Sequence, residues 1–167
     1  MAFLKPEDVD YLILHCSAGS TKSIAADLRA YHMKPVSDGG RGWSDIGYHF
    51  VVKYYGNTYS DIVEEGRPTT TMGAQAQGFN ARSLGICMVG NFDKIDPSQL
   101  QYAATVELIA ALAIKYEVAV ENILGHRETY DALGQRRMKT CPGTRVDLDK
   151  FRSDVAARIG GGNSLLV

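Results

Sequence analysis

Long apolar runs are missing from this chain of 167 residues, and their absence limits where the protein can work. No segment reaches the roughly 20 consecutive apolar residues that a membrane-spanning helix needs. The N-terminal segment meets charged residues and Pro6 early, so it lacks the apolar stretch of a secretory signal peptide. We therefore expect a protein that is made in the cytoplasm without a signal peptide and that does not insert into a membrane.

An excess of charge of either sign is also missing. The 18 lysines and arginines nearly balance the 19 aspartates and glutamates, which gives a formal net charge of −1. Nucleic-acid-binding domains usually carry a basic surplus that attracts the phosphate backbone. We therefore expect no nucleic-acid partner.

Cysteine is scarce in this sequence. The three cysteines, Cys16, Cys87 and Cys141, are an odd number at scattered spacings. Small secreted domains that depend on disulfides show even, dense cysteine patterns, so this pattern argues against a disulfide framework. Free thiols of this kind are typical of a reducing compartment.

The remaining composition is that of one ordinary globular domain, with 45% hydrophobic and 22% charged residues. Hydrophobic periodicity predicts strands at 9–15, 46–54, 58–60 and 82–90, and helices at 21–33, 97–116 and 147–159. No internal repeat or linker interrupts them. We predict a single α/β (α+β) domain over residues 1–160, with a central mixed β-sheet of about five strands packed with about three main helices. Residues 161–167 are expected to form a frayed tail.

Local signals refine two of these elements. Asp96 is placed to cap the longest helix, with Pro97 at its first position and Gln99 completing a capping box. In the strand at 46–54, alternation puts Tyr48 on one face and His49 on the other. Only one of these two side chains can then face a given site.

Three side chains that bind metals well lie next to predicted element ends or loops. His15 ends the first strand, His126 lies in Gly-His-Arg-Glu, and Cys141 lies in Lys-Thr-Cys-Pro-Gly. Two imidazoles and a thiolate can hold a tetrahedral Zn²⁺ and leave the fourth position open for water or substrate. This donor set predicts one zinc ion per chain and favours a hydrolase.

Five short blocks carry a resemblance to a known family. They are His15-Cys16-Ser17, Gly47-Tyr48-His49-Phe50, Gly78-Phe79-Asn80 with the strand 83–90, Gly125-His126-Arg127-Glu128, and Lys139-Thr140-Cys141-Pro142. Over about residues 9–152 the chain resembles the zinc-dependent N-acetylmuramoyl-L-alanine amidases of the phage lysozyme (endolysin) type, relatives of the peptidoglycan recognition proteins. The resemblance implies that His15, His126 and Cys141 bind the zinc and that Tyr48 and Lys139 assist the chemistry.

The resemblance also implies a function: hydrolysis of the amide bond between N-acetylmuramic acid and L-alanine in peptidoglycan. It implies a phage or prophage endolysin, expected to be a monomer, that reaches the host cell wall after holin-type release. Two alternatives stay open. One is a peptidoglycan-binding module without catalysis, against which the intact Cys141 argues. The other is a regulatory protein that binds the phage RNA polymerase, for which a pull-down would be the test.

The chain departs from the family pattern at Gln75, where the relatives often have histidine in a Gly-x-His-Ala-x-Gly stretch. Glutamine forms hydrogen bonds but takes up no proton at neutral pH, which excludes an acid–base role. The 127–140 segment is longer than in compact phage relatives. The arginines in or beside it are interpreted either as partners of stem-peptide carboxylates or as solvated side chains; they are Arg127, Arg136 and Arg137.

Five other side chains receive structural interpretations. His32 is expected to be solvated at a helix end, and His49 to be hydrogen-bonded on the other face of the sheet. Cys16 should point away from His15, and Cys87 should be a small core residue. Trp43 is interpreted either as a wall of the substrate groove or as a loop anchor.

Overall fold

A computed structural model describes residues 2–161, so the tail expected at 161–167 lies outside it except for Gly161. A five-stranded sheet forms the centre, in the order β3-β2-β4-β1-β5. The strands are β1 (Tyr11–Cys16), β2 (Phe50–Val52), β3 (Val63–Glu65), β4 (Ser83–Met88) and β5 (Ile123–Gly125). The α-helices are α1 (Ala25–Met33), α2 (Tyr59–Ile62), α3 (Gln99–Tyr116), α4 (His126–Ala132) and α5 (Leu148–Gly160).

The sheet is mixed, as predicted. Strands β1, β2, β4 and β5 run parallel, while β3 pairs antiparallel with β2 at one edge. The two longest strands, β1 and β4, lie side by side inside the sheet and are nearly all apolar, because an internal strand of a parallel sheet is covered on both faces. The carboxyl ends of these two strands determine where the residues at and just after those ends lie in the molecule.

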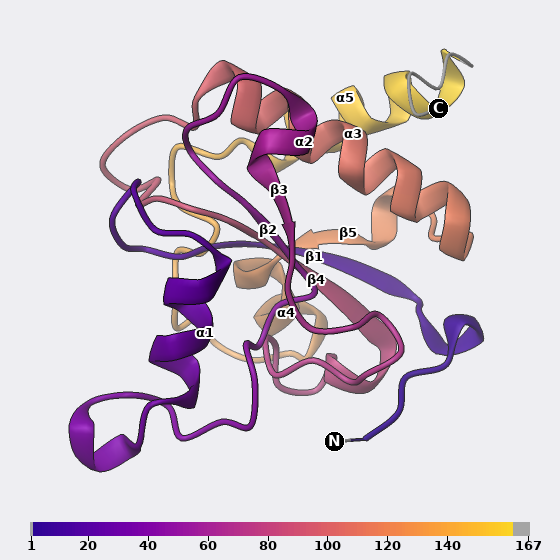
Figure 1. Cartoon of the computed structure of the whole chain (residues 1–167). Coiled ribbons are helices and arrows are strands. Elements are labelled where there is room, and N and C mark those ends of the chain that lie inside the picture. The colour runs from indigo at the N-terminus through magenta and orange to yellow at the C-terminus, as the bar shows by residue number, and fades with distance from the viewer. Residues whose placement is uncertain (1, 162–167) are drawn as a thin grey trace.

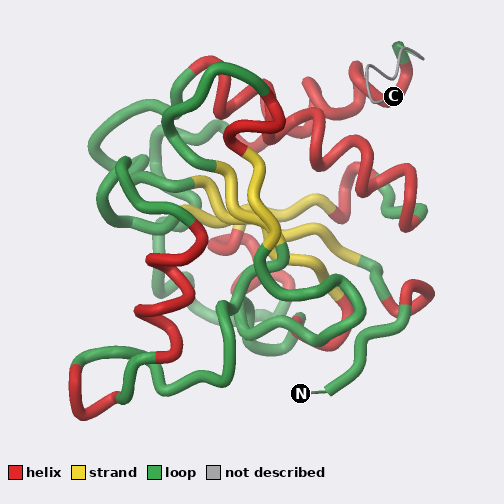
Figure 2. Tube along the Cα trace, viewed as in Figure 1, coloured by secondary structure: helices red, strands yellow, loops and turns green. Residues whose placement is uncertain are grey.

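Helices cover the two faces of the sheet unequally. Helices α3 and α5 pack together on one face over the larger hydrophobic core, and α1 lies on the opposite side (Figure 1). Figure 2 shows that loops make up much of the layer on the side of α1. The described residues contain no helix that is both long enough and apolar enough to span a membrane.

The start of α3 differs from the prediction. Its N-cap is Ser98, whose hydroxyl accepts a hydrogen bond from the backbone N–H of Gln101, whereas Asp96 lies outside the helix and pairs with Arg145. Ser98 Oγ also donates to the carbonyl of Tyr54. This tertiary contact places the serine at the helix end, and a local sequence signal cannot reveal it. Helix α1 likewise starts at Ala25, later than predicted.

The strand predicted at 58–60 is wrong. Thr58 caps the short helix α2, because its side chain accepts from the N–H of Asp61 and the Asp61 carboxylate accepts from the N–H of Thr58. The partner of β2 is β3, which follows that helix directly. The chain therefore adds a helical turn before it returns to pair with β2.

Candidate functional site

The structure brings His15, His126 and Cys141 together. One ligand atom of each lies within 4.8 Å of those of the other two. His15 Nδ1 is 3.8 Å from Cys141 Sγ, and the two imidazole centroids are 4.6 Å apart. His15 is 1% exposed and His126 is 9% exposed, so both imidazoles are largely withdrawn from water.

The sheet explains why two of these residues meet. His15 is near the end of β1, and β5 pairs alongside β1 in parallel before ending at Gly125. His126 follows directly as the first residue of α4, at the same end of the sheet as His15. A Cβ at Gly125 would lie 2.5 Å from Leu148 Cδ1 and 2.9 Å from Pro142 Cδ, so a larger residue here would have to displace these side chains.

Cys141 arrives on a loop that Arg127 holds in place. The backbone N–H of Arg127 donates to the carbonyl of Cys141 at 2.7 Å. Its guanidinium donates to the carbonyls of Thr140, Gly143 and Val146 at 3.1, 2.7 and 2.8 Å. The Arg127 side chain therefore anchors the loop and is not simply solvated. It also lines the cleft, so its proposed contact with stem-peptide carboxylates stays a prediction.

Two further contacts position the same loop. The Asp93 carboxylate accepts from the Thr140 hydroxyl and from the Thr144 N–H, both at 2.7 Å. The backbone N–H of Cys16 donates to Cys141 Sγ at 3.3 Å. Contacts from three separate parts of the chain thus hold the Cys141 thiol next to the two imidazoles.

Both imidazoles of the site are neutral at neutral pH. Burial, and next the neighbouring His126, hold the pKa of His15 well below its usual value. Burial, followed by the charge of Lys139, lowers the pKa of His126 to about 4. Neutral imidazole is the form that binds a metal ion, so both imidazoles are in the protonation state that metal binding requires.

Tyr48 lies against the site, although the strand alternation used to place it does not apply. Strand β2 begins only at Phe50, and Tyr48 packs with the core cluster on the side of α1 whereas Phe50 packs on the other side. The ring of Tyr48 is 5.1 Å from that of His15. Burial raises the pKa of Tyr48 well above its usual value, so the hydroxyl keeps its proton at neutral pH.

The site opens into a cleft of about 1300 Å³. Its lining residues include His126, Cys141, Tyr48, Lys139 and Trp43. Lys139 is exposed and lines the same cleft as His126 and Cys141, and its positive charge contributes to the lowered pKa of both imidazoles. The cleft therefore holds a potential metal site, a cation and a phenol within one concave surface.

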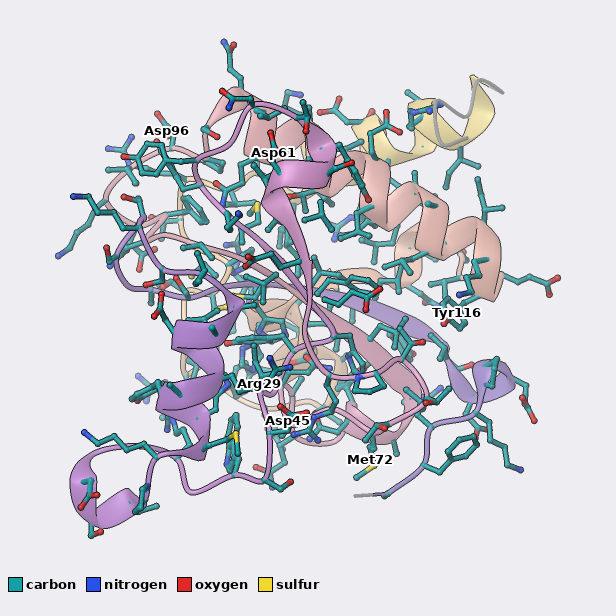
Figure 3. The ribbon with its side chains drawn as sticks, in the orientation of Figure 1. Arg29, Asp45, Asp61, Met72, Asp96 and Tyr116 are labelled. Carbon is teal, nitrogen blue, oxygen red and sulfur yellow. The ribbon has the colours of Figure 1, made fainter. Side chains whose placement is uncertain are left out.

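The expectation that His32 is solvated was wrong. His32 is 6% exposed, accepts from the N–H of Gly47 through Nδ1, and packs against Trp43 with 4.7 Å between ring centroids. Trp43 both lines the cleft and anchors its loop through this contact. The same loop is tied to α1 by Arg29, whose guanidinium points toward Asp45 and donates to it at 2.7 Å (Figure 3).

His49 and Cys87 behave as structural residues. His49 Nδ1 accepts from the N–H of Gly85, and Nε2 is 3.0 Å from the carbonyl of Thr71. His49 is thus hydrogen-bonded as expected. One of its partners is the main chain of the loop that carries Thr71. Cys87 is fully buried in β4, and Cys16 packs against the core on the side of α3 and α5.

The buried histidines predict an acid-sensitive fold. Burial lowers the pKa of His49 and of His32 to about 4, whereas an unfolded histidine titrates near about 6.5. Between these values the unfolded chain binds protons that the folded chain does not, so stability is complete above about pH 6.5 and falls toward about pH 4. Each such histidine adds a slope of about 1.4 kcal/mol per pH unit. Urea unfolding of wild type and His49→Gln between these pH values should give a shallower slope for the variant, and parallel curves would contradict the prediction.

Gln75, noted from the sequence only as a departure from the family pattern, contacts the site, and this contact was not predicted. Gln75 Oε1 lies 2.5 Å from His15 Nε2, and Gln75 is buried. The available signal was Gly85, a glycine in the middle of an otherwise apolar strand. A Cβ there would lie 2.6 Å from Gln75 Cγ, so the glycine makes room for this side chain.

Comparison with known proteins places the fold and the sequence in one family. The family model described as N-acetylmuramoyl-L-alanine amidase matches residues 5–144. The endolysin of Escherichia phage T7 is 35% identical over 71% of this chain and 76% of that protein. Peptidoglycan-recognition protein SC2 of Drosophila melanogaster is 32% identical over 83% and 70%. The solved N-acetylmuramoyl-L-alanine amidase LysC from Clostridium intestinale shares the fold, with a TM-score of 0.72 over 93% of this chain and 91% of that one, at 22% identity.

Proposed function

Since this chain belongs to the N-acetylmuramoyl-L-alanine amidase family, it is a peptidoglycan amidase of the endolysin type, and we propose that it works with one zinc ion bound by His15, His126 and Cys141. The bond cleaved is the amide between N-acetylmuramic acid and L-alanine. The observation that carries the zinc proposal is the convergence of three ligand atoms within 4.8 Å at the wall of the cleft. The host cell wall is the proposed place of action.

The donor set fits zinc better than other common ions. Two imidazole nitrogens and a thiolate suit a borderline-soft cation, whereas Mg²⁺ and Ca²⁺ prefer oxygen ligands. Three protein ligands are the pattern of catalytic zinc sites, which keep one position open. A bound zinc ion supplies a Lewis acid that polarises the amide carbonyl and lowers the pKa of water.

Lys139 supplies positive charge to the reaction centre in this proposal. Lys139 lines the cleft together with His126 and Cys141, and its side chain is exposed and therefore free to meet a substrate there. As water attacks the amide, negative charge develops on the carbonyl oxygen. A hydrogen bond from Lys139 to that oxygen is stronger in the transition state than in the ground state, which accelerates the reaction.

In this proposal Tyr48 provides a protonated phenol hydroxyl next to the metal site. Because burial raises its pKa, the phenol donates a hydrogen bond at neutral pH and does not act as a base. It can orient the attacking water or pass a proton to the leaving nitrogen. The ring contact with His15 holds the phenol against the metal site.

The test is product analysis on purified peptidoglycan. We expect the zinc-containing protein to release new alanine amino groups without new reducing sugar ends, the signature of amide cleavage. A chelator should abolish the release and added zinc should restore it. New reducing ends would refute the amidase, and binding of peptidoglycan without any release would favour the non-catalytic module.

A further inference from the structure

One buried hydrogen bond links the metal site to a side chain that the mechanism does not use. His15 Nε2 faces Gln75 Oε1 at 2.5 Å, while the opposite ring nitrogen, Nδ1, lies 3.8 Å from Cys141 Sγ. Gln75 is 8% exposed and His15 is 1% exposed. The two nitrogens of His15 therefore have separate tasks: one faces a glutamine and one faces the proposed zinc ligands.

The direction of this hydrogen bond follows from its neighbours. The carbonyl of Phe79 can only accept, so the Ser83 hydroxyl donates its single proton to it at 2.8 Å. Ser83 Oγ must then accept from Gln75, whose Nε2 is 2.7 Å away. The amide oxygen of Gln75 is left facing His15, so His15 Nε2 carries the proton and Nδ1 presents a lone pair.

Gln75 is itself held at both ends. The Asn80 side-chain oxygen accepts from the backbone N–H groups of Gln75 and Ala76 at 2.8 and 2.9 Å. Gly85 provides the space for the glutamine side chain, as described above. Asn80, Ser83 and Gly85 all belong to the block around 78–90, whose polar and glycine positions the proposed catalytic residues leave unexplained.

We propose that Gln75 is a positioning residue that holds His15 in the tautomer with the proton on Nε2, so that Nδ1 binds the zinc. This proposal rests on the zinc site of the proposed function. Metal-binding histidines commonly donate their other N–H to such a partner, and loss of the partner weakens metal binding about 10–100-fold. Here the serine and a main-chain carbonyl fix which end of the amide faces the ring.

The test compares Gln75→Met with wild type in two measurements. In the metal-free protein, ¹H–¹⁵N correlation spectra of the His15 ring should show the Nε2–H tautomer for wild type and a mixture for Gln75→Met. Zinc affinity, measured by competition with a chelator, should fall about 10–100-fold in the variant. Gln75→Glu retains an acceptor for the Nε2 proton, so it should keep the wild-type tautomer and recover most of the affinity.

Gln101→Met is the matched control. Gln101 is also a buried glutamine, and its amide donates to the carbonyls of Val52 and Val89 in the core under α3. Its replacement should lower the unfolding temperature but leave zinc affinity and the His15 tautomer unchanged. A merely structural role for Gln75 would make Gln75→Met behave like this control.

Each outcome decides one question. Tight zinc binding with an unchanged tautomer in Gln75→Met would overturn the positioning role and leave the amidase standing. A wild-type protein that binds no zinc would refute the metal site instead, while the tautomer of the metal-free ring would still test Gln75. If Gln75→Met fails to fold, Ser83→Ala frees the glutamine amide to rotate and should itself give mixed tautomers; a single Nε2–H tautomer there would overturn the proposal.

Discussion

The Cys141→Ser protein should lose its zinc and, with it, nearly all amidase activity. A serine hydroxyl stays protonated at neutral pH and is a poor zinc ligand, whereas a thiolate gives both charge and a soft donor. We expect about one zinc per chain in the wild type and little in the variant. Zinc affinity should fall by more than the roughly 100-fold that loss of an outer-shell partner causes.

Cys87→Ala is the control for this experiment. Cys87 is a buried thiol, paired in register beside His15 on the neighbouring strand, but it is not among the three converging ligand groups. This variant should retain zinc, although removal of a buried side chain lowers its stability. Undiminished zinc in Cys141→Ser, measured by elemental analysis after dialysis, would refute the ligand assignment.

Two substitutions should separate chemistry from metal binding. Lys139→Ala and Tyr48→Phe should keep the zinc and the fold, yet each should lower turnover about 10²–10³-fold, the usual effect of losing one donor to a transition-state oxyanion. The loss should appear in kcat with little change in KM, because the lost interaction forms only as charge develops. Release of alanine amino groups from peptidoglycan is the measurement.

Exposed residues of the same types provide the controls. Lys94 and Tyr55 are exposed and do not line the cleft, so Lys94→Ala and Tyr55→Phe should keep full turnover. If Lys139→Ala and Tyr48→Phe match these controls while the wild type cleaves the amide, the roles of Lys139 and Tyr48 are wrong and the metal proposal is unaffected.

The parts of the fold that sequence reasoning predicted are those with a strong local pattern. Strand β4 is nearly all apolar and is buried along its whole length, and α3 repeats apolar residues at helical spacing, so both were found close to their observed bounds. The three converging residues were also found, because imidazole and thiol groups in short distinctive motifs stand out without any knowledge of distances. Their roles as ligands stay a prediction until the zinc is measured.

The features that sequence reasoning missed depend on contacts between distant segments. Arg127 looks like any surface arginine until the loop at 140–146 places three carbonyls around it. His32 looks solvated until Trp43 covers it, and Ser98 becomes the cap of α3 because it also reaches Tyr54. None of these partners can be inferred from the spacing of residue types alone.

The position of β1 in the sheet also bears on how the protein becomes active during synthesis. This first strand is central, and its two neighbours are β4 and β5, which are translated much later. Contacts between residues so far apart in sequence form slowly, because a long loop must close before they stabilise anything. A growing chain on the ribosome therefore cannot bring His15, His126 and Cys141 together before residue 141 has emerged.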